Sequence, residues 1–125
     1  MYSISNNGII TMTRGDSIQV PLFINAGDET DPARYKITDR DTVYLGIMEP
    51  NTPFEHSLIR KVYTKENTNK YGDVVIELSL DDTQYLQPGT YYYEAKLKQV
   101  KQINDTKSIE IIDTVVPRRK LFIVE

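Results

Sequence analysis

The chain has 125 residues and a formal net charge of −3, which predicts a single domain, residues 1–125, with one hydrophobic core. The chain is mildly acidic, whereas a protein that binds the phosphate backbone carries a basic patch or stripe. We therefore expect no nucleic-acid partner. The absence of cysteine excludes disulfides, thiolate metal sites and cysteine nucleophiles. No signal-peptide pattern is visible, and no run approaches the roughly 20 apolar residues of a membrane span. We therefore expect a soluble, unprocessed chain without membrane insertion.

Apolar and polar residues alternate over several short runs, a pattern typical of half-buried β-strands. The first clear run is residues 17–24, where Pro21 lacks an N–H group and predicts an edge strand or a bulge. Further runs are residues 42–48, 58–64, 73–80, 90–100, 107–113 and 120–125. We expect their inward-facing side chains to form one core between two sheets: Ile18, Val20, Leu22, Val43, Leu45, Val74, Ile76, Leu78, Tyr91, Tyr93, Ala95 and Leu97.

Turn-forming residues separate these runs, notably Pro88-Gly89 and Asn104-Asp105. Residues 80–86 are compatible with one helical turn capped by Asp81 or Asp82. The polar stretch of residues 25–41 predicts a long loop, and the basic residues 117–120 predict a charged hairpin turn. About seven or eight short strands punctuated in this way indicate an antiparallel β-sandwich.

The tripeptide Arg14-Gly15-Asp16 has two interpretations. On a displayed loop it is an integrin ligand, whereas here it separates the apolar runs of residues 8–12 and 17–24, which would pair as neighbouring strands. Gly15 accommodates the positive φ of a tight turn, and Asp16 can bond to nearby backbone N–H groups. Because so short a motif often arises by chance, we favour a structural turn.

No catalytic set is evident. His56 is the single histidine, so neither a nucleophilic triad nor a zinc site can be assembled in the usual ways, and a surface loop is the better reading. Neighbouring carboxylates do not by themselves have the fixed separation of a glycosidase pair, and EF-hand spacing is absent. They are Asp28, Glu29 and Asp31, Asp39 and Asp41, and Asp81 and Asp82. We expect no enzyme, catalytic residue, cofactor or metal site, with Ca²⁺ at the acidic loop as an open alternative.

Tyrosines are numerous and cluster at residues 91–93. On a strand Tyr91 and Tyr93 share a face, so Tyr92 points to the other face. Either Tyr92 is an ordinary surface ring, or it lies in a protein–protein contact, since tyrosine is enriched at interface cores.

The C-terminal run has four consecutive apolar residues, Leu121, Phe122, Ile123 and Val124. Whichever pair faces the core, the other pair faces outward. The run also contains no proline that would block strand addition, as Pro21 does in its own strand. The pattern therefore predicts an unprotected edge strand. We expect the outward pair, together with Tyr92, to be covered by another protein.

The order of these features resembles the small immunoglobulin-like domain at the N-terminus of phage upper baseplate proteins. Three segments carry the resemblance: the turn Arg14, Gly15 and Asp16; the segment Leu86, Pro88, Gly89, Thr90, Tyr91 and Tyr93; and the terminal strand of residues 120–124. The resemblance implies an all-β, immunoglobulin-like antiparallel β-sandwich in which the tripeptide is a fold signature. The sequence departs from larger family members in having no C-terminal extension, so we expect a free-standing module.

The resemblance implies a non-enzymatic structural component of a phage particle, made in the host cytoplasm and located in the virion. Its implied partners are other virion structural proteins in a multi-copy assembly, at a tail, baseplate, connector or capsid-decoration position. The alternative is a carbohydrate-binding module for host-surface glycans, with Tyr35, Tyr44, Tyr63 and Tyr92 as the aromatic platform.

Overall fold

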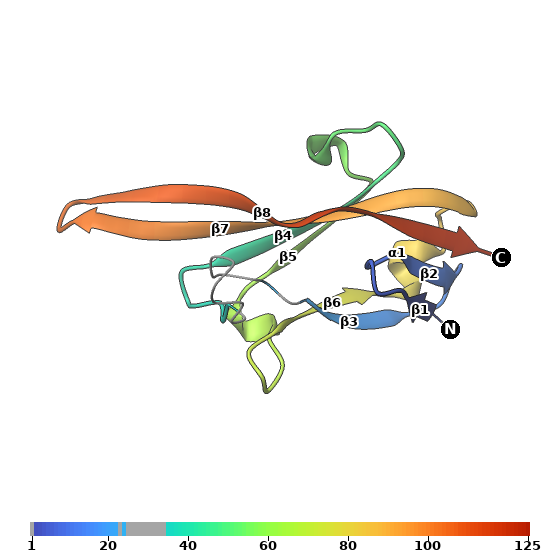
Figure 1. The fold of residues 1–125 in the computed structure, drawn as a ribbon, viewed down its shortest axis with the longest axis horizontal. Helices are drawn as coiled ribbons and strands as arrows, with labels where there is room; N and C mark the ends of the chain where they lie inside the picture. The colour runs from blue at the N-terminus through green and yellow to red at the C-terminus, as the bar shows by residue number, and fades with distance from the viewer. Residues whose placement is uncertain (1, 23, 25–34) are drawn as a thin grey trace.

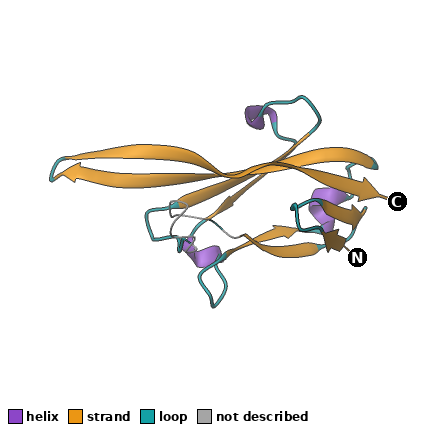
Figure 2. Ribbon diagram, in the orientation of Figure 1, coloured by secondary structure: helices purple, strands orange, loops and turns teal. Residues whose placement is uncertain are grey.

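The computed structural model describes residues 2–22, 24 and 35–125. Strands make up most of this part of the chain (Figure 2). In chain order the elements are β1 (Tyr2–Ile4), β2 (Ile10–Thr13), β3 (Ile18–Leu22), β4 (Thr42–Met48), η1 (Phe54–His56), β5 (Ile59–Tyr63), η2 (Lys65–Asn67), β6 (Val74–Leu78), α1 (Leu80–Thr83), β7 (Gly89–Asn104) and β8 (Lys107–Val124).

The strands form two layers. One sheet has six strands in the order β1-β2-β8-β7-β4-β5, and the second pairs β3 with β6. Figure 1 shows β3 and β6 lying beneath the larger sheet. The predicted all-β sandwich of seven or eight strands is therefore confirmed. The expectation of purely antiparallel pairing is wrong, because Ile10–Thr13 of β2 pairs in parallel with residues 121–124 of β8.

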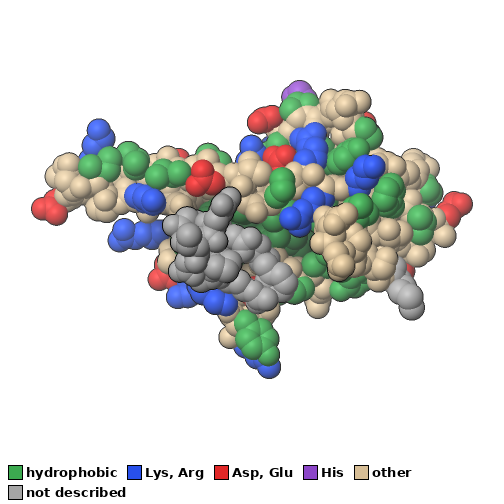
Figure 3. Space-filling view, viewed as in Figure 1, with side chains coloured by type: hydrophobic (Ala, Val, Ile, Leu, Met, Phe, Trp, Pro, Cys, Tyr) green, Lys and Arg blue, Asp and Glu red, His purple; other side chains and the backbone are tan. Residues whose placement is uncertain are grey.

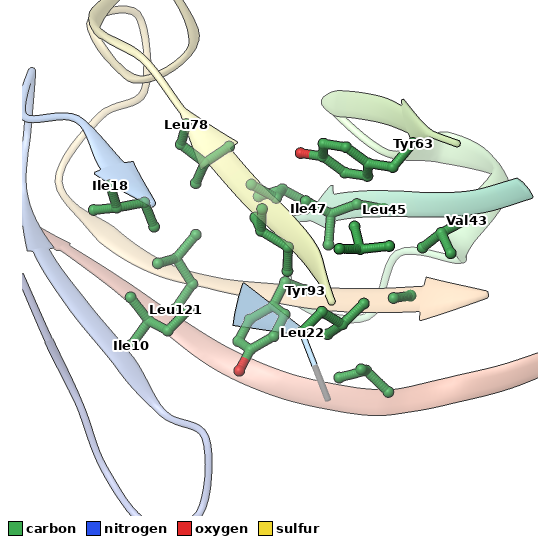
Figure 4. Close-up of a cluster of buried hydrophobic side chains, with 14 of the residues drawn as sticks. Ile10, Ile18, Leu22, Val43, Leu45, Ile47, Tyr63, Leu78, Tyr93 and Leu121 are labelled. Atoms are coloured by element: carbon green, nitrogen blue, oxygen red, sulfur yellow. The ribbon is translucent and has the colours of Figure 1, made fainter. Parts of the chain in front are cut away.

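The core lies between the two layers, as Figure 4 shows. Of the twelve predicted core residues, eleven are buried, and Val20 is half-buried against the same cluster. The prediction of a single core is confirmed, and it follows from the period of two that places alternate strand residues on one face. The prediction that Pro21 lies in an edge strand is also confirmed, since in the described part of the chain β3 pairs with β6 alone.

Residues 117–120 do not form the expected hairpin turn. They lie inside β8, which runs without interruption from Lys107 to Val124. The pairing of β7 with β8 shifts register between Tyr93 and Ala95, opposite Arg119 and Val116, so β8 has an extra residue there. Pro117 lies in this irregularity, where a missing N–H group breaks no regular ladder bond. Two strands predicted separately are thus one long strand.

The short helix α1 follows β6 directly and is held by its first turn. Ser79 donates its backbone N–H and its hydroxyl to Asp82 Oδ2, at 2.8 and 3.1 Å. Lys61 of β5 forms an ion pair with the same oxygen at 2.9 Å. The predicted helical turn is present, but Ser79 precedes it as the cap and Asp82 closes it from the third helical position. In the described part of the chain no helix is long and apolar enough to cross a membrane.

Candidate interaction surfaces

The histidine and the acidic side chains of the described ranges form no metal-binding cluster. No group of three or more His, Asp or Glu residues in this part of the chain is placed to hold a metal ion. His56 is exposed at the end of η1, and Asp39 forms an exposed ion pair with Lys65 at 3.3 Å. Asp41 is buried and accepts a hydrogen bond from the Tyr35 hydroxyl at 2.5 Å. The acidic residues Asp28, Glu29 and Asp31 lie outside the described residues.

The tripeptide Arg14-Gly15-Asp16 forms a tight turn. Asp16 N–H donates to Thr13 O at 3.0 Å, and Gly15 has φ +88°, as the third residue of a type II turn requires. The turn does not join paired strands, because β2 belongs to the large sheet and β3 to the small one. The expected pairing of these two runs is wrong, since a turn at this position carries the chain from one layer to the other.

The segment Pro88-Gly89 connects α1 to β7. Pro88 and Gly89 are exposed, and β7 begins at Gly89. The Tyr91 hydroxyl donates to Gln87 O at 2.7 Å and ties the buried start of β7 to this connection. The segment therefore has the structural role that the sequence indicated.

The C-terminal strand presents its two pairs to opposite faces. Leu121 and Ile123 are 1% and 2% exposed in the core, whereas Phe122 is half-buried and Val124 is 42% exposed on the outer face. The inference of an unprotected edge is wrong for these four residues. They lie between β2 and β7, and the parallel pairing with β2 supplies the cover that the sequence pattern did not reveal.

Tyr92 lies on the same outer face of the large sheet. It is directly opposite Met48 of β4 and Lys120 of β8, and Phe122 is the next outward residue along β8. Tyr92 and Phe122 are both half-buried. Together with Val124 they form what we call the outer-face patch, a small apolar area that fits a modest contact rather than a deep pocket.

The connection between β4 and β5 folds back over this outer face. Gly46 lies beneath it, and an added Cβ at this position would collide with Ser57 Oγ and with the ring of Phe54. Lys96 Nζ lies 5.0 Å from the centroid of the Phe54 ring. The glycine thus permits a close approach of the loop to the sheet.

Arg118 fastens the same loop. Its Nη1 donates to Thr52 O at 2.7 Å, and its Nε lies 3.5 Å from Glu94 Oε1. Met48, fully buried, lies against the guanidinium with its sulfur 3.0 Å from Nη2. A basic residue that the sequence suggested for a turn instead holds a loop on the sheet.

Among the described residues, the far half of the β7–β8 hairpin has no second strand layer and projects from the sandwich (Figure 1). Pairing of β4 with β7 ends at Lys98, and pairing of β2 with β8 begins only at Leu121. Residues 99–111 therefore form a two-stranded ribbon, and together with Ile112 at its base we call them the arm. The sequence indicated both strands and the turn at Asn104-Asp105, but the length of the projection depends on where β4 stops.

Apolar side chains are exposed along the arm, and Figure 3 shows them on the surface of the projection. Ile103 is 54% exposed, Ile109 39% and Ile112 59%. Ile109 is directly opposite Lys101 on one face, and Ile112 is opposite Lys98 on the other. A ribbon of only two strands is marginally stable in water, and here it carries uncovered isoleucines on both faces.

The base of the arm is anchored to the body through Tyr35. Gln99 Nε2 donates to the Tyr35 hydroxyl at 3.0 Å, and that hydroxyl donates to Asp41. Burial raises the pKa of Tyr35, and the hydrogen bond to Asp41 raises it further. The hydroxyl therefore stays protonated and keeps donating to the carboxylate, so it links Gln99 at the base of the arm to Asp41 of the body.

Comparison with protein-family models, with curated protein sequences and with solved structures finds no significant match. The arm and the outer-face patch are therefore the features of the molecule that bear on its function.

Proposed function

We propose that this protein is a non-enzymatic assembly component that acts through protein–protein contacts, and that the assembly is a phage particle, as the sequence resemblance implies. One observation supports the contact role above the others: the arm extends beyond both layers of the sandwich with its isoleucines exposed. Exposed apolar surface on a projecting element is typical of a protein contact site.

The outer-face patch supports the same role at a second position. Phe122 and Val124 face away from the core, and Tyr92 lies beside them. Aromatic and aliphatic side chains on one sheet face are the composition found at the centre of interfaces. The partners that we propose are other structural proteins of the particle, present in several copies.

The test is incorporation into purified phage particles. In the arm-less variant, residues 100–110 are replaced by Asn-Gly, so that the directly opposite pair Gln99 and Ile111 flanks a two-residue hairpin turn. We expect the wild-type chain at a fixed ratio to the major capsid protein in quantitative mass spectrometry. The arm-less variant should be folded by circular dichroism and depleted from particles.

Two substitutions complete the design. Phe122→Ser removes the aromatic ring of the outer-face patch and should reduce incorporation while leaving the core intact. Val62→Ser alters an apolar residue on β5 that is 57% exposed and lies outside the outer-face patch, and it should leave incorporation unchanged. Absence of the wild-type chain from particles would overturn the proposal, as would full incorporation of both the arm-less and Phe122→Ser variants.

The carbohydrate-binding alternative has less support in the geometry. Tyr63 is buried, with its hydroxyl accepting from Glu77 N–H at 3.3 Å, and Tyr35 is engaged at the base of the arm. Tyr44 and Tyr92 share the outer face, but they are not neighbours. Tyr92 is opposite Met48, which is four residues from Tyr44 along β4. Specific binding of the wild-type chain on a glycan array would favour this alternative instead.

A further inference from the structure

We infer that the arm pairs with the arm of a second copy of this chain, edge to edge along β8. The inference rests on the proposed role of the arm as a contact site and names its partner. In the described part of the chain, β8 has a strand neighbour on only one side from Lys107 to Lys120, since β2 reaches only residues 121–124. The free edge of β7 in the arm is shorter, residues 99–104.

Over residues 108–113 the free edge of β8 lacks two of the devices that block strand addition, proline and β-bulges. Residues 108–113 form a regular ladder with β7, without a proline or a register shift. One register shift lies at the tip, between Gln102 and Asn104, and the others, with Pro117, lie toward the body. A regular, extended edge with three isoleucines, Ile109, Ile111 and Ile112, is a template for another strand.

The charges along this edge are complementary to themselves. Lys107 and Asp113 are each three residues from Glu110. In an antiparallel pair with Glu110 on the two-fold axis, Lys107 lies opposite Asp113 of the second copy. The two-fold symmetry generates a second, equivalent ion pair. Ile109 then lies opposite Ile111 of the second copy, and directly opposite residues share a face. Both ion pairs and apolar pairs are thus satisfied in one register.

The only unfavourable pair in this register is Glu110 against its own copy. Lys98 Nζ lies 3.8 Å from Glu110 Oε1, so at the axis each carboxylate has an ammonium group of its own chain beside it. The product is a four-stranded ribbon in the order β7-β8-β8-β7, with two copies of Ile109 and Ile111 contiguous on one face. Four strands with an apolar face reach the size at which a sheet becomes independently stable.

The register is tested by a single introduced thiol, because the natural chain has no cysteine. With Glu110→Cys the two thiols lie directly opposite, at about 4.5–5.5 Å between Cα atoms, which suits a disulfide. With Ser108→Cys on the same strand, each thiol is opposite residue 112 of the other copy, and the two thiols are roughly 13 Å apart. Mild oxidation should produce covalent dimer from the first variant and little from the second.

The wild-type chain should sediment as a dimer of the 14.4 kDa protomer, and the arm-less variant as a monomer. Lys107→Asp should weaken dimerisation about tenfold, and the swap Lys107→Asp with Asp113→Lys should restore it. A monomeric wild-type chain, or equal crosslinking of the two thiol variants, would overturn the inference. Loss of the arm-less variant from particles would still support the proposed function in that case, so the two failures are distinguishable.

Discussion

The two halves of the β7–β8 hairpin have the same strand pairing but different surroundings. In the half that lies in the body, Tyr91, Tyr93 and Leu97 alternate inward and are buried against the second layer. In the arm the alternation continues, but Ile109 and Ile112 remain exposed. Alternation therefore specifies which side chains share a face, whereas a second layer decides whether that face is buried.

The body half and the arm should also differ in what their residues contribute, stability in the body and association with a partner in the arm. Body residues lose water on folding and supply most of the hydrophobic free energy, at about 25 cal/mol per Å² of apolar surface. Arm residues keep much of their surface in water until a partner covers them. Substitutions in the two halves should consequently give opposite patterns, with large changes in unfolding free energy in the body and large changes in association at the arm.

The largest expected effect contrasts Leu121→Ala with Ile109→Ala. Leu121 is 1% exposed, so its truncation should lower the free energy of unfolding by about 2–5 kcal/mol. Ile109→Ala should change it by less than about 0.5 kcal/mol at protein concentrations where the chain is monomeric. Urea unfolding followed by circular dichroism measures both. Equal losses for the two variants would mean that the arm contributes to the core.

A second prediction concerns the turn that brings the second layer under the body. Gly15 has φ +88°, and an added Cβ would meet only Leu80 Cδ1, at an ordinary 3.5 Å. Gly15→Ala should therefore cost about 1–2 kcal/mol from the backbone alone, and Gly15→Val at least as much. Asp16→Glu, which abolishes integrin recognition, should leave particle assembly unchanged. Integrin-dependent cell adhesion that is lost in Asp16→Glu would contradict the structural interpretation of the turn.

A third prediction concerns the pH dependence of a carboxylate contact in the body, that of Asp82. Burial acts to raise the pKa of Asp82, but hydrogen bonds from Ser79 and the Lys61 ammonium outweigh it and hold the pKa below its ordinary value of 3.8. Because the folded-state pKa is lowered, the ionised carboxylate stabilises the fold fully above pH 3.8, and this contribution disappears as the pH falls through the lowered value.

Asp82→Asn should thus lower the free energy of unfolding by about 1 kcal/mol near neutral pH. The difference in free energy of unfolding between Asp82→Asn and the wild type should narrow as the pH drops below 3.8. Urea titrations at several pH values measure the gap, and Glu110→Gln in the arm is the matched control. A constant gap at all pH values would show that charge has no part in the contact.

The smallest expected effect is that of removing the arm. Replacing residues 100–110 by Asn-Gly deletes no residue of the buried core cluster and leaves the Gln99 contact with Tyr35 in place. The melting temperature of the monomer should therefore change by only a few degrees. A collapse of the cooperative transition would contradict the separation of the hairpin into a body half and an arm.

Several features of the molecule follow from the sequence by itself. The period of two predicts the strands and the inward-facing side of each, with Ile18, Val43, Leu78 and Leu97 buried, because backbone geometry sends alternate side chains to opposite faces. Gly15 and Pro21 are local signals as well, since a turn with positive φ and a missing N–H group act within a few residues. These predictions needed no knowledge of which strands are neighbours.

Strand neighbours were decided only by the tertiary structure. Four consecutive apolar residues at 121–124 predict a strand that is apolar on both faces, but nothing local indicates that β2 pairs with it in parallel and makes it an interior strand. The continuity of β8 through Pro117 depends in the same way on a bulge between Val116 and Arg119, opposite the segment from Tyr93 to Ala95. The arm is the clearest case, because its exposure is set by where β4 and β2 end, and contacts between residues distant in sequence determine those ends.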